Sequence, residues 1–145
     1  WNQWPEIAWR DPRAPAHVGD LPHTWVAAEY VLAVRSLFAY EREADQTLVL
    51  GAGLAPEWIT GRGVEVSEMP TLYGRLSFSL RASDANTLHI KIAGALSARI
   101  VVRPPLARPL SSVTVNGHAC ASFDNDSVTI TATPADVICR ISAEL

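Results

Sequence analysis

The hydrophobic pattern of this chain changes once, near residue 46, from the period of a helix to the period of a strand. Residues 24–41, TWVAAEYVLAVRSLFAYE, contain good helix formers without Gly or Pro, and Thr24 is the predicted N-cap after Pro22. From residue 46 onward, apolar and polar residues alternate in short segments, as they do in strands with one buried face. The pattern therefore predicts one long helix followed by a mainly β domain.

Short strands separated by turn residues fill the second part of the chain. The turn cluster 83–86 predicts a hairpin, and Asn116-Gly117 predicts another because this pair favours tight turns between antiparallel strands. Turns about every 8–12 residues are typical of sandwiches and barrels. We predict an antiparallel β-sandwich of eight or nine strands over residues 46–145. Its strands are expected at 48–50, 64–66, 76–80, 88–92, 100–102, 113–115, 118–123, 128–130 and 137–141.

The first 22 residues follow neither period. They contain Trp1, Trp4 and Trp9 among four prolines, and proline restricts the backbone and removes hydrogen-bond donors. Residues 1–23 are therefore predicted to form an irregular lead-in. Because tryptophan presents a large apolar area, we expect these rings to pack on the rest of the domain or on a partner.

Apolar residues surround the axis of the predicted helix, to which we assign the segment 24–42. A helix that is apolar on every side is normally buried on every side, and one sheet of a sandwich covers only part of it. We expect the remaining surface to contact further protein, either neighbouring helices of a larger protein or a second copy of the chain. The apolar positions are Trp25, Val26, Ala27, Tyr30, Val31, Leu32, Val34, Leu37 and Phe38.

Composition argues against several classes of function. Twelve Lys and Arg residues against 15 Asp and Glu give a formal net charge of -3, so nucleic acid is not an expected partner. No apolar run has the roughly 18–20 residues of a membrane span, so no membrane partner is expected. Cys120 and Cys139 are predicted to be buried small hydrophobic residues, with a disulfide as the alternative. Without a CxxC pair or a His/Cys cluster, neither a metal site nor a cofactor is predicted.

The most informative polar residues lie around the start of the helix. Asp20, His23 and Trp25 bring a carboxylate, an imidazole and an indole to its first turn, a combination that suits sugars because their C–H faces stack on aromatic rings. Glu29 stands nearly alone on the apolar helix, and apolar surroundings favour the protonated carboxyl group that a general acid needs. Glu29 is therefore the catalytic candidate. The alternative is that it pairs with an arginine or caps a neighbouring loop.

Four segments of the chain carry a family likeness: GDLPHTWVAAEYVLAVRSLFAYE, TLVLGAGLAPEWI, MPTLYGRLSFSL and VTVNG. Together they resemble the C-terminal part of bacterial glycosidase-like proteins of the six-hairpin, α/α-toroid class. In that class a helical barrel precedes a small β-sandwich, and the N-terminal ends of the inner helices face the sugar-binding funnel. The resemblance implies that Asp20, His23 and Trp25, with Glu29 behind them, lie at or near the rim of a carbohydrate site. The chain departs from the family in length, because a toroid needs many helices and only one is predicted here.

The resemblance implies a C-terminal accessory domain of a carbohydrate-active enzyme. Glycoside hydrolysis uses two carboxyl groups beside the scissile bond, and no motif ties a second one to Glu29. The catalytic residues are then expected in a helical toroid outside this chain, which would be the partner of the predicted helix. One alternative is a stand-alone carbohydrate-binding module that uses Trp58, Tyr73 and the early tryptophans, although a residue placed like Trp58 more often anchors a short helical turn to the core, and one placed like Tyr73 more often packs at the end of a strand. The other alternative is a structural or interaction domain without a ligand.

Overall fold

A computed structural model describes residues 4–7, 10–11, 13 and 19–143 of the chain. The chain divides into two units, residues 1–36 and 37–145. The first unit contains the lead-in and most of helix α1 (Thr24–Phe38), and the second contains the strands. Among the described helices, none combines the length and the apolar character that crossing a membrane requires.

Helix α1 begins beside a histidine. The carbonyl of His23 accepts a hydrogen bond from the amide of Ala27 at 3.2 Å, which is the first bond of the helix. His23 therefore takes the N-cap position, and the prediction of Thr24 as the N-cap is one residue too late. In the described part of the lead-in before it, the amide of Glu6 donates to the carbonyl of Asp20 at 3.2 Å. Trp1 and Trp9, which we expected to pack against protein, lie outside the described residues.

Helix α1 ends at Phe38, so the expectation that it continues to residues 41–42 is corrected. The amide of Gly53 donates to the carbonyl of Leu37 at 3.1 Å, and the amide of Gly51 donates to the carbonyl of Phe38 at 2.8 Å. These bonds satisfy carbonyls that have no partner at the end of a helix. A Cβ atom at Gly53 would lie 2.7 Å from the Cα atom of Leu37, so only glycine permits this close approach.

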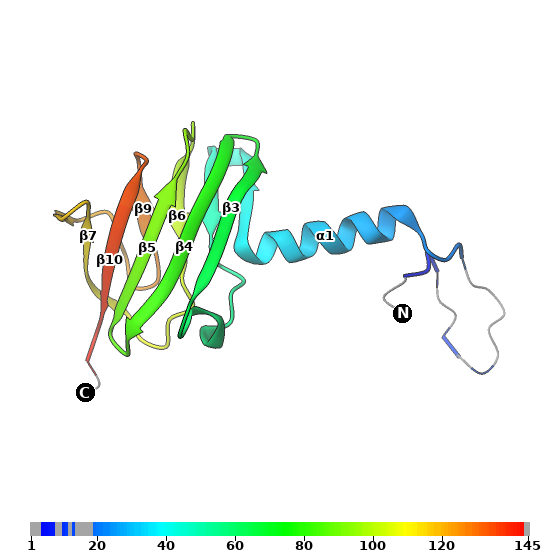
Figure 1. Cartoon of the computed structure of the whole chain (residues 1–145), viewed down its shortest axis with the longest axis horizontal. Helices are drawn as coiled ribbons and strands as arrows, with labels where there is room; N and C mark the ends of the chain where they lie inside the picture. Colours follow the sequence, from blue (N-terminus) through cyan, green and yellow to red (C-terminus); the bar gives the residue numbers. More distant parts are fainter. Residues whose placement is uncertain (1–3, 8–9, 12, 14–18, 144–145) are drawn as a thin grey trace. The chain divides into compact units, whose positions relative to one another are not determined.

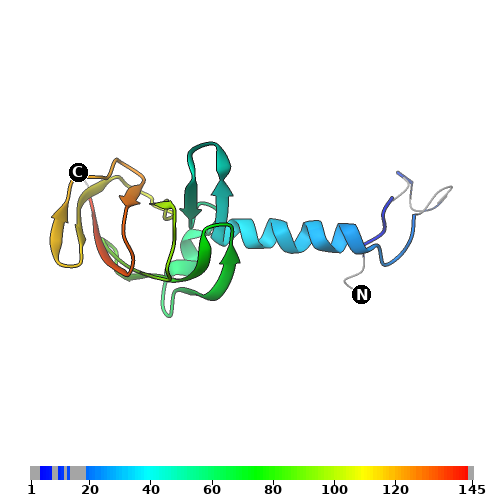
Figure 2. The ribbon, with the colours of Figure 1, turned by 90° about the horizontal axis from the view of Figure 1, so that it is seen from above.

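Among the described residues of the second unit, ten strands form two sheets. The four-stranded sheet has the order β1-β2-β6-β9, and the six-stranded sheet has the order β3-β4-β5-β10-β7-β8. Figures 1 and 2 show them as two facing layers, which we call the sandwich. The strands are β1 (Ala39–Arg42), β2 (Thr47–Leu50), β3 (Val64–Thr71), β4 (Gly74–Asp84), β5 (Thr87–Ala93), β6 (Arg99–Val102), β7 (Leu110–Val115), β8 (His118–Cys120), β9 (Val128–Ile130) and β10 (Ala135–Ile141). The short 3-10 helix η1 (Glu43–Asp45) lies between β1 and β2 of the four-stranded sheet, and η2 (Pro56–Ile59) lies between β2 and β3, where the chain passes to the six-stranded sheet.

The alternating pattern located β2 to β10, because each expected segment overlaps one of these strands. Both predicted hairpins are confirmed: Asp84 pairs with Thr87, and Val115 pairs with His118 across the turn at Asn116-Gly117. Two details of the prediction are wrong. Strand β1 is a tenth strand in a segment that we assigned to the helix, and β2 and β6 run parallel, so the sandwich is not wholly antiparallel.

The core of the sandwich lies between the two sheets. Leu48, Leu50 and Ile100 face it from the four-stranded sheet, and Leu80 and Ile90 face it from the six-stranded sheet, each at most 1% exposed. Burying one such side chain stabilises the fold by roughly 1.5–3 kcal/mol. Among the described residues, every buried member of this cluster comes from Ala39 or later in the chain. The core described here is therefore formed by residues of the second unit.

Both cysteines are free thiols, so the disulfide alternative is wrong, and the predicted burial is confirmed for Cys139 but not for Cys120. Cys139 is buried and Cys120 is half-buried, and each pairs in register with Val113 of β7, one from each side. Burial raises the pKa of the Cys139 thiol to about 12. The thiol therefore stays protonated and behaves as a small hydrophobic group.

Candidate functional site

Three residues predicted for a sugar site, Asp20, His23 and Trp25, lie together around the first turn of α1. The imidazole Nδ1 of His23 lies 3.9 Å from a carboxylate oxygen of Asp20, and its ring meets the indole of Trp25 edge to face, with centroids 5.8 Å apart. The side chain of Asp20 is 89% exposed and that of His23 is 21% exposed. The turn therefore presents an acceptor, a ring nitrogen and an aromatic face together.

A second aromatic pair adjoins this turn. The ring of Trp4 stacks on Tyr30 with centroids 5.4 Å apart and planes inclined by 24°. The carbonyl of Trp4 also accepts a hydrogen bond from the amide of His23 at 3.0 Å, which ties the lead-in to the start of α1. We call Trp4, Asp20, His23, Trp25 and Tyr30 the aromatic cluster. Trp4 was a candidate in the binding-module alternative, as one of the early tryptophans, whereas Tyr30 was expected only as an apolar residue of the helix.

Glu29, the catalytic candidate, is exposed on α1. Its side chain forms no hydrogen bond or ion pair among the described residues, so the arginine partner considered from the sequence does not appear there. Exposure also differs from the apolar surroundings on which its proposed acid role depended. The catalytic role of Glu29 therefore stays a prediction from the sequence.

Trp58 belongs to the sandwich unit, where it lies in η2. Its ring stacks on Phe38 with centroids 6.1 Å apart and planes inclined by 23°. The next residue, Ile59, is buried in the core. Trp58 thus contributes to anchoring the 3-10 turn while keeping part of its ring exposed, so both interpretations of this residue retain support. Tyr73, the other platform candidate, is half-buried and packs against the core.

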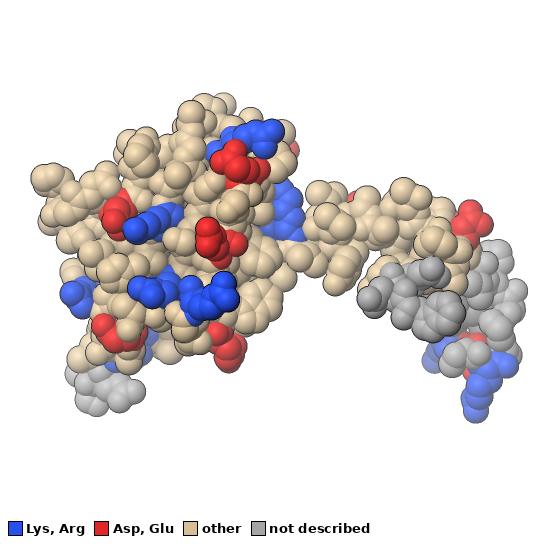
Figure 3. All heavy atoms as spheres, viewed as in Figure 1, with Lys and Arg blue, Asp and Glu red and all other residues tan. Residues whose placement is uncertain are grey.

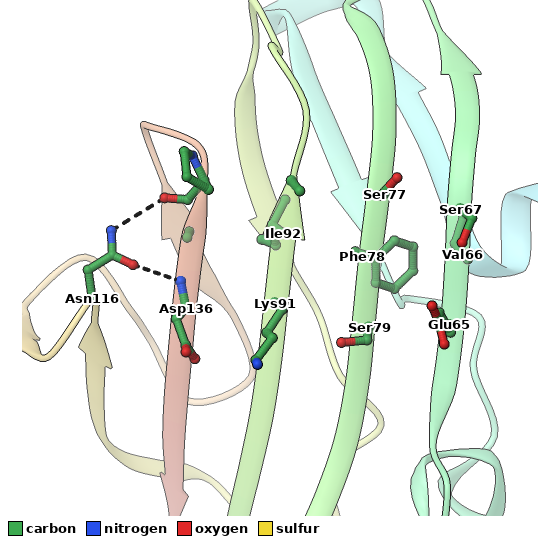
Figure 4. Close-up of a pocket in the computed structure, with 13 residues that line it drawn as sticks. Glu65, Val66, Ser67, Ser77, Phe78, Ser79, Lys91, Ile92, Asn116 and Asp136 are labelled. Atoms are coloured by element: carbon green, nitrogen blue, oxygen red, sulfur yellow. Dashed lines mark hydrogen bonds between the residues drawn. The ribbon is translucent and has the colours of Figure 1, made fainter.

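A groove of about 590 Å³ crosses the outer face of the six-stranded sheet. Glu65 of β3 pairs with Ser79 of β4, Ser79 pairs with Lys91 of β5, and Lys91 pairs with Asp136 of β10. Figure 4 shows these four side chains in one row across neighbouring strands. The groove was not predicted from the sequence, because alternation marks outward residues without telling which of them become neighbours.

Hydrogen bonds fix both ends of this groove. At one end Asn116, with a φ of 50°, donates from Nδ2 to the carbonyl of Pro134 at 3.3 Å and accepts from the amide of Asp136 at 2.8 Å. At the other end β3 bulges, and the hydroxyl of Ser77 accepts from the amide of Glu68 at 2.9 Å and donates to its carboxylate at 3.2 Å. Bulges re-aim side chains and are frequent beside binding sites.

Charges of both signs are interspersed over this face of the sandwich. Figure 3 shows acidic and basic side chains alternating over β3, β4, β5 and β10 rather than forming a patch of one sign. Within the described ranges, no group of three or more His, Cys, Asp or Glu residues is arranged to hold a metal ion. The groove therefore presents both hydrogen-bond donors and hydrogen-bond acceptors.

Comparison with known proteins adds no relative. No protein-family model matches the chain, and neither the curated proteins nor the solved structures contain a match.

Proposed function

We propose that this chain is the C-terminal accessory domain of a carbohydrate-active, glycoside hydrolase-like enzyme. In this proposal α1 docks against helices of a catalytic domain, the aromatic cluster contributes to the rim of its sugar site, and the sandwich supports both. The cleavage of the glycosidic bond belongs to residues of the catalytic domain. The proposal takes its enzyme class from the resemblance of the segments 19–41, 47–59, 69–80 and 113–117 to six-hairpin glycosidase-like proteins.

The observation that carries the docking role is the exposure of α1. The helix has no buried residue, although most of its side chains are apolar. Val31 is 63% exposed, Tyr30 54% and Leu32 51%, and these residues point to different sides of the helix axis. Large exposed apolar surfaces mark places where proteins associate. Neighbouring helices would cover such a surface by packing along it.

The composition of the aromatic cluster supports a sugar as the nearby ligand. Trp25 and Tyr30 each keep 54% of their surface exposed, which leaves ring faces for stacking on C–H groups. Asp20 and His23 offer an acceptor and a ring nitrogen for hydroxyl groups at the same turn. An apolar face with a few placed polar groups is the usual composition of a small-molecule site.

The docking role is tested with two variants of the full chain, each of which replaces one leucine by lysine. Leu32→Lys places a charge on the exposed apolar helix, and Leu72→Lys places the same charge on the sandwich, where Leu72 is 69% exposed. We expect the unaltered chain to bind a hydrophobic dye and to self-associate in sedimentation experiments. Leu32→Lys should reduce both signals, and Leu72→Lys should leave them nearly unchanged. A monodisperse chain that binds no dye, or equal effects of the two variants, would refute docking through α1.

The enzyme class is tested on the gene. We expect the coding region upstream of Trp1 to encode paired amphipathic helices with a carboxylate pair suited to glycoside cleavage. A reading frame that begins close to Trp1, or one that encodes a different class of domain, would contradict the proposed parent enzyme.

A further inference from the structure

We propose that the groove on the six-stranded sheet binds a neutral oligosaccharide, which lies across the strands along Glu65, Ser79, Lys91 and Asp136. This site shares no residue with the aromatic cluster, and the chemistry of the groove alone supports it. The volume of about 590 Å³ falls within the range of ligand sites, roughly 300–1,000 Å³. Three strand spacings of about 4.8 Å give the row a length of about 14 Å, which suits an elongated ligand.

Donors and acceptors alternate along the row. Glu65 and Asp136 offer carboxylate acceptors, Lys91 offers an ammonium donor between them, and the hydroxyl of Ser79 does both. Sugar hydroxyls also donate and accept, so a chain of sugars can satisfy such a row. In the part of the chain that the structure describes, the side chains of Glu65, Lys91 and Asp136 form no hydrogen bond or ion pair, which leaves them available to a ligand.

The charges of the row select against other ligand classes. Two carboxylates flank the single ammonium group, so a polyanion such as an acidic polysaccharide would be repelled. A purely apolar ligand would leave these charged groups without hydrogen-bond partners, at a cost in free energy. Small side chains, Ser67, Ser77 and Ala93, keep the groove open between the charged positions. A neutral, hydroxyl-rich chain fits both the charge and the space.

The groove is held open before any ligand arrives. Asn116 fixes the backbone of Pro134 and Asp136 at one end, and the bonded pair Glu68 and Ser77 fixes the bulge at the other. A preformed site loses little conformational freedom on binding. No exposed aromatic ring is among the described lining residues, so we expect modest affinity, with a dissociation constant on the order of 1 mM.

Lys91 is the only lysine in the chain, which gives a direct probe of the groove. Reductive methylation with 13C-formaldehyde keeps the charge of the amine and labels a single lysine, whose NMR signal is distinct from that of the terminal amine. The full chain is titrated with linear neutral oligosaccharides of glucose, mannose, xylose and N-acetylglucosamine, and with oligogalacturonate as the anionic arm. We expect at least one neutral oligosaccharide to shift the Lys91 signal saturably, and no shift with oligogalacturonate.

Matched variants locate the binding. Ser79→Tyr fills the groove, and Ser112→Tyr places the same side chain outside it, because Ser112 is exposed on β7 beside Arg140. We expect binding to weaken at least tenfold in the first and to be unchanged in the second. If Ser79→Tyr does not fold, Asp136→Asn replaces it as the test. This variant preserves the shape of the side chain and should weaken binding several-fold.

Three results would overturn the proposal: no neutral oligosaccharide shifts the signal, the anionic chain binds better, or the two tyrosine variants behave alike. Trp25→Ala should leave the Lys91 response intact. A failure of the proposed function at α1 is therefore distinguishable from a failure of this groove.

Discussion

Replacing Asn116 by alanine removes two separate contributions that the structure assigns to this side chain. The first is conformational, because Asn116 has a φ of 50°, a left-handed conformation that asparagine adopts more readily than alanine. The second is hydrogen bonding, because the side-chain amide bonds the carbonyl of Pro134 at 3.3 Å and the amide of Asp136 at 2.8 Å. Asn116→Gly separates the two, since glycine accepts the conformation and lacks the side chain.

The magnitudes follow from these contacts. A left-handed conformation costs an ordinary residue roughly 1–2 kcal/mol, and we take about 1 kcal/mol as the difference between alanine and asparagine. Each hydrogen bond contributes about 0.5 kcal/mol, the lower end of the usual range, because Asn116 is exposed. Asn116→Ala should therefore lower the free energy of unfolding by about 2 kcal/mol, and Asn116→Gly by about 1 kcal/mol.

Urea denaturation followed by circular dichroism of the strands measures both values. With a slope of about 2 kcal/mol per molar urea, the midpoint should fall by about 1 M for Asn116→Ala and by about half that for Asn116→Gly. The order of the two variants is the critical result. If glycine destabilises as much as alanine, the conformational argument is wrong. If neither variant changes the midpoint, the hydrogen bonds do not hold this end of the groove.

Three further predictions concern the ion pair of Asp45, the buried thiol of Cys139 and the backbone conformation of Gly94. A hydrogen bond from Arg42 holds the pKa of Asp45 at about 2, below its value in the unfolded chain. The ionised Asp45 therefore stabilises the fold fully above about pH 4, and this stabilisation is lost as the pH falls toward 2. Asp45→Asn should remove this pH dependence of the free energy of unfolding between about pH 4 and pH 2. Iodoacetamide near pH 8 should leave the buried Cys139 unmodified in the folded chain, as mass spectrometry would show. Gly94→Ala should cost about 3 kcal/mol in urea unfolding, because φ is 126° and the new Cβ would overlap the carbonyl oxygen of Arg75.

The sequence pattern located nearly all the strands because alternation reports which residues face the core. It failed at Ala39–Arg42, where AYER continues a helix-forming segment with neither Gly nor Pro to stop it. Pairing decides the outcome there: Tyr40 pairs with Val49, and Gly51 and Gly53 bond the last carbonyls of α1. These partners are distant in sequence, so local propensity could not reveal them.

The two candidate sites were predictable to different degrees. Asp20, His23 and Trp25 are neighbours in sequence, and the local geometry of a helix start brings them together. Glu65 and Asp136 share a groove only because four strands align in one particular register. A shift of one residue in any pairing would turn such side chains to the other face of the sheet. The groove is thus a property of the register, which a single sequence does not report.

The buried core determines the stability of the sandwich, whereas the exposed apolar side chains of α1 affect the stability of the helix. Because the buried core, among the described residues, begins at Ala39, polar substitutions such as Leu32→Lys should leave unfolding of the sandwich nearly unchanged. Helix α1 has 15 residues, and isolated helices of about 12–15 residues are marginal in water. Its stability must therefore come from packing of its exposed apolar side chains, so helical circular dichroism should rise with protein concentration as the chains associate. A helix signal that stays constant on dilution would show that α1 needs no partner, and the docking proposal would lose its physical basis.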